Sequence, residues 1–291
     1  MFIIKISKYF LQSIIIYIFF IIIKIVGLKL SRKFFSYIFN TIGPLIKSEQ
    51  TLNNNLEKFL GFYNPNIKKK IKTEMWSNYG KTFVEYLYLQ KLKNMSTHIE
   101  VKGEEILNKI KKNNKPVIFV SGHFANFELM SMELTKRNIN LATIYRPLNN
   151  FFINPFMEYL RKKYICRNQI KKGLAGVKES INYLKNNFSV ALMIDQRVSE
   201  GKRLPFFEHM ALTTTLPAQL ATKYQLDIVP IYISRTASNN FEMEIFDPIK
   251  TASEESFETQ KLDLTIELNK IVEKMVSKNP GQWIWTHNRW K

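Results

Sequence analysis

Apolar residues follow different patterns along the chain, and each pattern predicts a different structural setting. Residues 9–23 are almost entirely apolar, and the run resumes after Lys24 as far as Leu28. This span is close to the ~20 residues that a helix needs to cross a bilayer. Residues 31–46 instead carry apolar side chains at helical spacing among basic ones, which predicts an amphipathic helix.

The N-terminal apolar run has three possible settings. The first is a membrane anchor helix over residues 1–30, but basic residues on both flanks leave its orientation weakly specified. The second is a cleaved signal peptide, which is disfavoured because the run is long and no small-residue cleavage site follows it. The third is a helix that lies in one leaflet. The helix at 31–46 either contacts acidic lipid or packs on the main domain.

From residue 101 onward, short apolar runs alternate with segments of helical periodicity, whereas residues 53–100 have helical spacing. Strands are predicted at 117–121, 141–145, 190–194, 228–234 and 241–246, and helices at 124–136, 155–163, 174–185, 216–224 and 260–277. Such alternation predicts an α/β fold with a mostly parallel central sheet flanked by helices. The predicted division is an anchor at 1–30, a helical membrane-proximal region at 31–100 and an α/β core at 101–291. Residues 31–291 are expected to form one domain.

Charge, cysteine content and missing motifs limit which partners, metal sites and cofactors the chain could have. The net charge of +19 favours anionic partners, which are nucleic acid, acidic lipid or an acidic protein. Lysine is abundant throughout the chain, so any one lysine cluster is equally well explained as solvated surface. Cys166 is the single cysteine, which excludes a disulfide framework and a cysteine metal site. No cofactor is expected, because the chain lacks G-x-x-x-x-G-K-[ST] and H-E-x-x-H motifs.

Residues 116–128 read P-V-I-F-V-S-G-H-F-A-N-F-E and contain the candidate chemistry. A buried strand ending at Gly122 would place His123 at the rim of a sheet, with Glu128 on the first turns of the next helix. A carboxylate that hydrogen-bonds an imidazole fixes the tautomer of the ring and stabilises the imidazolium. Such a pair suits the histidine to act as a general base. No Ser or Cys stands in a G-x-S-x-G elbow. The residues therefore predict that His123 deprotonates an acceptor hydroxyl directly, and the alternative is a structural histidine at a strand end.

Four further segments accompany S-G-H-F-A-N-F-E at 121–128. They are I-Y-R-P-L-N-N at 144–150, M-I-D-Q at 193–196, L-P-F-F with T-T-T-L-P-A-Q-L-A within 204–221, and Q-W-I-W-T-H-N-R-W-K at 282–291. Together these segments resemble the late acyltransferases of lipid A biosynthesis, the lauroyl and myristoyl transferase family. That family belongs to the larger H-x-x-x-x-[DE] glycerolipid acyltransferase superfamily. Glu208 and Leu216 depart from the pattern, because the family usually has glycine at both positions. The F-P-E-G phosphate motif is also missing, which argues against a glycerol phosphate acceptor.

The resemblance implies roles for individual residues. It makes His123 the general base, Glu128 its orienting partner, and Arg146 a cation beside the thioester or a substrate phosphate. The residues expected to bind substrate are Asn126, Asn149, Asp195 and Gln196. Two of the residues named above also have a purely structural interpretation. Arg146 could form a surface ion pair, and Asn149 could be a turn residue.

The implied reaction moves a fatty acyl group to a hydroxyl of a lipid A precursor without an acyl-enzyme intermediate. The implied location is the cytoplasmic face of the bacterial inner membrane. Acyl carrier protein is the implied donor, with coenzyme A as the alternative, and nucleic acid is not an expected partner. The basic residues suited to the acidic carrier are Arg161, Lys162, Lys163, Arg167, Lys171 and Lys172. Those suited to either substrate or to acidic lipid are Lys68, Lys69, Lys70 and Lys72.

Two other functions stay open at this point. One is an acyltransferase that modifies a different membrane glycolipid or an aminolipid. The other is a membrane-tethered module that binds anions through its net positive charge and has no catalytic activity.

Overall fold

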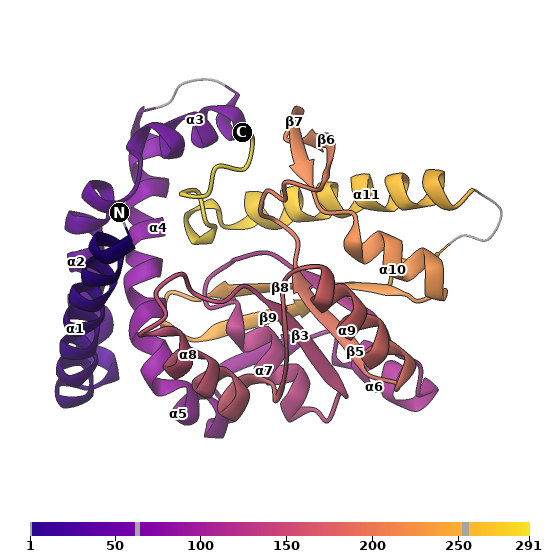
Figure 1. Cartoon of the computed structure of the whole chain (residues 1–291), viewed down its shortest axis with the longest axis horizontal. Helices are drawn as coiled ribbons and strands as arrows, with labels where there is room; N and C mark the ends of the chain where they lie inside the picture. Colours follow the sequence, from indigo (N-terminus) through magenta and orange to yellow (C-terminus); the bar gives the residue numbers. More distant parts are fainter. Residues whose placement is uncertain (1, 62–64, 252–255) are drawn as a thin grey trace.

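The computed structural model describes residues 2–61, 65–251 and 256–291 (Figure 1). A layer of N-terminal helices lies beside an α/β unit. The helices of this layer are α1 (Phe2–Val26), α2 (Leu28–Ile46), α3 (Glu49–Leu60), α4 (Pro65–Glu85) and α5 (Leu89–Asn94). The predicted helical region at 53–100 is therefore broken. Its α3 segment ends at Gly61, whose φ of +67° suits a glycine helix cap. Residues 62–64 of that region lie outside the described residues.

Helix α1 is long and apolar enough to cross a membrane, which is consistent with membrane anchoring. It also packs along the rest of the chain. The hydroxyl of Tyr17 donates to the carbonyl of Phe152 at 3.0 Å, and the ammonium of Lys24 donates to the carbonyl of Leu87 at 2.7 Å. The opposite side of α1 exposes large apolar side chains, so one face of this helix is bound to the protein and the other is free to contact lipid.

Within the described residues, seven strands form one sheet in the order β1-β9-β8-β2-β5-β3-β4. These strands are β1 (Ile99–Lys102), β2 (Ile118–Ser121), β3 (Leu141–Tyr145), β4 (Asn168–Lys171), β5 (Ser189–Met193), β8 (Ile228–Arg235) and β9 (Phe241–Ile245). All neighbouring pairs are parallel except β8 with β9. The prediction of an α/β fold with a mostly parallel sheet is confirmed.

Helices cover both faces of the sheet. They are α6 (Glu104–Asn113), α7 (Glu128–Lys136), α8 (Asn154–Leu160), α9 (Leu174–Lys185), α10 (Leu216–Tyr224) and α11 (Phe257–Lys278). The two hydrophobic cores meet at β2, where Phe119 points into one core and its neighbours Ile118 and Val120 point into the other. A strand that is apolar on both faces is typical of the centre of a parallel sheet.

The helix predicted at 124–136 starts late, and this is a correction with consequences for the site. Helix α7 begins only at Glu128. Ahead of it, Ala125 has a φ of +45°, and its N–H donates to the carbonyl of Gln282 at 2.9 Å. That backbone conformation is not helical, so residues 122–127 form a loop that the C-terminal segment holds in place.

A hairpin that the sequence pattern did not predict projects beyond the sheet. Strands β6 (Lys202–Phe206) and β7 (His209–Thr213) pair antiparallel, with Phe206 opposite His209. The two linking residues, Phe207 and Glu208, have φ values of +49° and +61°. Positive φ at both positions is the signature of a type I′ turn, in which glycine is favoured.

Candidate active site

The site begins at the carboxyl ends of two neighbouring parallel strands. In the β2–β5 pairing, Ser121 lies opposite Met193, so the chain segments after both strands emerge at the same edge of the sheet. That edge is where α/β proteins place their ligands. Gly122 fits this crowded position because a Cβ there would lie 3.2 Å from the Asp195 carboxyl carbon and 2.6 Å from the Phe124 ring.

His123 and Asp195 meet at this edge. The imidazole Nδ1 lies 2.7 Å from Oδ1 of Asp195, and the backbone N–H of His123 donates to Oδ2 at 2.8 Å. The side chain of Asp195 is fully buried, whereas that of His123 is 21% exposed. Burial opposes ionisation of Asp195, but the adjacent His123 and its hydrogen bonds hold the pKa of this carboxyl below its ordinary value. An ionised Asp195 accepts a hydrogen bond from Nδ1–H, which leaves Nε2 as the basic atom of the imidazole.

Glu128 does not take the position that the sequence pattern predicted. Its Oε1 accepts hydrogen bonds from the hydroxyl of Tyr86 at 2.6 Å and from Nε of Arg161 at 2.8 Å. Both residues are described, and Glu128 does not hydrogen-bond His123 as expected. Asp195 is the carboxylate that contacts the imidazole instead. The five-residue spacing fails because residues 122–127 form a loop and not a helix.

The other predicted residues divide between the site and its surroundings. Gln196 lies beside the base, with its amide nitrogen 3.5 Å from Nε2 of His123. Arg146 and Asn149 are exposed in the loop after β3. Asn126 is 1% exposed, and its amide donates to Oε2 of Glu85 at 3.0 Å. The structure thus brings His123, Asp195 and Gln196 together, and it directs Asn126 into the protein interior.

A buried ionic cluster supports the loop that carries His123. Glu85 is fully buried and forms ion pairs with Arg235 and with Arg32. The same stretch of α4 supplies Asn78 and Thr82, whose side chains donate to the carbonyl of Ala125 at 3.3 and 3.1 Å. Sequence reasoning missed this cluster because its members are scattered over four segments and have no common spacing.

The C-terminal segment also reaches the site. The indole Nε1 of Trp283 donates to Oδ2 of Asp195 at 2.8 Å. Nε2 of His287 accepts the backbone N–H of Arg197 at 2.9 Å, and burial lowers the pKa of this imidazole to about 4. His287 is therefore neutral at physiological pH and acts as an acceptor that holds the segment after Asp195.

An apolar pocket of about 290 Å³ adjoins His123. The pocket is lined mainly by aliphatic and aromatic side chains, among them Phe20, Phe83, Phe127, Leu148 and Met157. Ile16 and Phe20 come from α1, so the apolar N-terminal helix forms part of the pocket wall. A pocket of this kind excludes water and suits a hydrocarbon chain.

Two kinds of chemistry receive no support from the described residues. Cys166 is buried, and burial raises the pKa of its thiol, so it is unsuited to act as a nucleophile. Among the described residues, no group of three or more His, Cys, Asp or Glu is placed to hold a metal ion.

Comparisons with known proteins identify the family of this chain. The model of the bacterial lipid A biosynthesis acyltransferase family matches residues 3–291. The chain is similar to the lipid A biosynthesis palmitoleoyltransferase of Escherichia coli (strain K12) and to the lipid A biosynthesis acyltransferase of Shigella flexneri. Each is 24% identical over 258 residues, which cover 85% of this chain and 80% of the relative.

A third relative, lipid A biosynthesis acyltransferase 2 of Shigella flexneri, is 24% identical over 186 residues, covering 63% of this chain and 58% of that protein. The resemblance found in the sequence motifs is confirmed by the match of the family over nearly the whole chain. The chain therefore belongs to the bacterial lipid A biosynthesis acyltransferase family.

Proposed function

We propose that this acyltransferase moves a fatty acyl group from acyl carrier protein to a hydroxyl of a lipid A precursor, with His123 as general base and Asp195 as its partner. The observation that carries the proposal is the position of the imidazole. Its Nδ1 contacts a buried carboxylate, and the ring borders an apolar pocket. This arrangement places a base next to a compartment for an acyl chain.

The proposed reaction follows from the contact between the imidazole of His123 and the ionised carboxylate of Asp195. Nε2 of His123 takes the proton of the acceptor hydroxyl while the hydroxyl oxygen attacks the thioester carbonyl. The new carbon–oxygen bond forms, the carbon–sulfur bond breaks, and the departing thiolate receives the proton from the imidazolium. Asp195 stabilises the imidazolium between these steps. The acyl group passes directly to the acceptor, so no acyl-enzyme forms.

The remaining predicted residues have different proposed roles. Gln196 positions the acceptor hydroxyl, since its amide is adjacent to Nε2 of His123. Arg146 and Asn149 are exposed beyond β3 and supply donors for a substrate phosphate or for the developing oxyanion. Glu128 and Asn126 are positioning residues, because each is held by a partner within the protein.

The carrier and the membrane define the surroundings of the site. An acidic carrier suits the exposed basic residues around β4, which are Lys162, Lys163, Arg167, Lys171 and Lys172. Arg161 was predicted to contact the carrier, but it is not part of this surface because it is buried and forms an ion pair with Glu128 at 2.7 Å. We place α1 as the anchor, with the catalytic unit on the cytoplasmic face of the inner membrane.

Mass spectrometry of product lipids tests this function. The full chain in detergent is incubated with a tetra-acylated lipid A precursor and either acyl carrier protein or coenzyme A thioesters. We expect the mass of one acyl group to be added from the carrier protein and not from coenzyme A. We expect His123→Ala to abolish the transfer, whereas His209→Ala, on the exposed hairpin, retains it. Unchanged turnover by His123→Ala would refute the base, and equal use of coenzyme A would refute the donor.

A further inference from the structure

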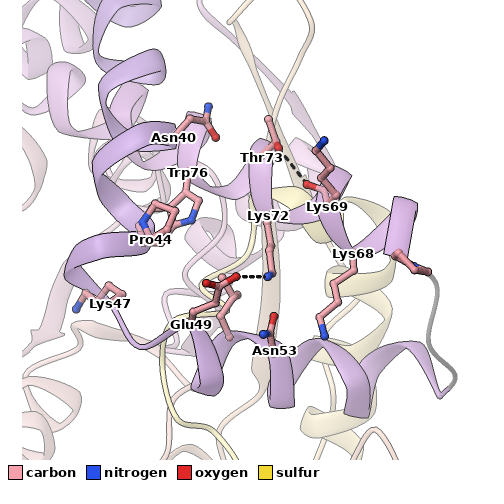
Figure 2. A pocket seen from close by; sticks show the side chains of 12 residues that line it. Asn40, Pro44, Lys47, Glu49, Asn53, Lys68, Lys69, Lys72, Thr73 and Trp76 are labelled. Carbon is pink, nitrogen blue, oxygen red and sulfur yellow. Dashed lines mark hydrogen bonds and ion pairs between the residues drawn. The ribbon is translucent and has the colours of Figure 1, made fainter.

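Two pockets of the N-terminal helical layer are lined by lysines, and they differ in whether the lysine charges are balanced. The pocket between α2, α3 and α4 contains ion pairs from Lys72 to Glu49 at 2.9 Å and from Lys68 to Glu57 at 2.7 Å. Figure 2 shows both lysines reaching from α4 toward α3. Much of the positive charge at this pocket is therefore taken up by carboxylates of the protein itself.

The second pocket, the α1–α2 hollow, lies where α1 turns into α2 and is bordered by α4, α5 and the β8–β9 loop. Its volume is about 850 Å³. The basic residues that line it are Lys29, Arg32, Lys33, Lys81 and Lys91. Arg32 is paired with the buried Glu85 at 2.8 Å. Across the described ranges, none of the four lysines has a carboxylate within ion-pair distance, and no acidic residue lines the hollow.

Lys81 shows that the positive charge in the hollow is not fully compensated. Its side chain is half-buried on α4. The pKa of its ammonium lies below the ordinary value because burial removes solvent and because Arg235 repels it, while Glu85 acts in the opposite direction. An anion bound in the hollow would offset both the lost solvation and the repulsion.

The hollow also offers groups that a free anion would not use. Val26, Leu28 and Leu30 line it, and Leu30 is 62% exposed. Exposed apolar side chains beside unpaired lysines match a ligand that combines a negative charge with an apolar tail.

We propose that the α1–α2 hollow binds an anionic phospholipid, for which phosphatidylglycerol is the probe. The phosphate lies among the lysines, and the acyl chains lie along the apolar residues Val26, Leu28 and Leu30 at the end of α1 and the start of α2. A folded acidic carrier protein fits less well, because the exposed Leu30 lines the same hollow and suits an acyl chain. This lipid site is separate from the apolar pocket beside His123, because His123 does not line the hollow.

Native mass spectrometry of the full chain tests the proposal. The protein in neutral detergent micelles is exposed to equal amounts of phosphatidylglycerol and phosphatidylcholine, and the retained lipid is counted. We expect a preference for phosphatidylglycerol that falls roughly tenfold or more in the Lys81→Gln, Lys91→Gln double variant. The double variant Lys109→Gln, Lys112→Gln, which removes equal charge from exposed positions of α6, should keep the preference.

Amine acetylation provides a second readout that needs no variant. Phosphatidylglycerol should protect Lys81 and Lys91 but not Lys109, and His123→Ala should show the same protection because acyl transfer is not involved. An equal loss of preference in both double variants would show diffuse attraction and overturn the site. Protection by acyl carrier protein or by the lipid A precursor, without protection by phosphatidylglycerol, would overturn the assigned occupant.

Discussion

The indole N–H of Trp283 donates to Oδ2 of Asp195 at 2.8 Å, and the same oxygen accepts the backbone N–H of His123 at 2.8 Å. A residue of the C-terminal segment thus holds the carboxylate that contacts the base. Because Asp195 is fully buried, its ionised form depends on these donors.

Trp283→Phe removes this donor and leaves a ring in the core. We expect kcat to fall about tenfold, because a hydrogen bond to a charged group is lost and Asp195 orients His123 less well. Trp290→Phe is the matched control, since its indole donates to the carbonyl of Phe206 at 3.0 Å and not to the site. Steady-state kinetics that gave the same loss of kcat in both variants would contradict this role for Trp283.

Glu208→Gly should stabilise the protein. Glu208 has a φ of +61° in the turn between β6 and β7, a conformation that costs a non-glycine residue about 1 kcal/mol. We expect the free energy of unfolding in urea to rise by about that amount. Glu200→Gly should give no gain, because Glu200 is exposed but has no positive φ. A Glu208→Gly variant no more stable than the parent would argue against the turn geometry.

His287 should make stability depend on pH below neutrality. Burial lowers the pKa of this imidazole from 6.5 to about 4, so the unfolded chain binds its proton at a higher pH than the folded chain does. The stabilisation is therefore present above about pH 6.5 and is lost as the pH falls toward 4.

Urea unfolding at pH 7.5 and pH 5 measures this effect. His287→Gln keeps an acceptor for the N–H of Arg197 but has no imidazole to protonate, so its stability should change less between the two pH values. The exposed His209→Gln should behave as the parent does. An unaltered pH dependence in His287→Gln would exclude this histidine as the cause.

The sequence pattern located those elements whose apolar periodicity is strong and local. The helices predicted at 174–185 and 216–224 match α9 and α10 at both ends. The strands β1 and β4 were not predicted, because each is four residues long and mixes polar with apolar positions. Both lie at the edges of the sheet, where pairing with one neighbour fixes a strand that its own sequence does not specify.

Asp195 could not be predicted as the residue that contacts His123, because this contact also depends on the tertiary structure. Asp195 is 72 residues away in the sequence and meets His123 only because β2 and β5 are neighbours in the sheet. Strand order follows from the tertiary structure and not from spacing. Glu128 is near in sequence, but the left-handed Ala125 breaks the helical path that would have brought it to the imidazole.

Glu128 has its own predicted phenotype. Its carboxylate is buried against Arg161, and breaking a buried ion pair leaves an uncompensated charge. We expect Glu128→Gln to lower the free energy of unfolding by about 3 kcal/mol. We expect Glu128→Gln with Arg161→Met to recover part of that loss, because the unpaired guanidinium is then removed.

The most direct measurement is kcat per folded molecule for Asp195→Asn and Glu128→Gln, compared under conditions where both variants are folded. If Asp195 is the partner of the base, kcat falls by about 100-fold or more in Asp195→Asn and by less than about tenfold in Glu128→Gln. A folded Asp195→Asn enzyme with near-parental kcat, beside a folded Glu128→Gln enzyme that is inactive, would contradict the account.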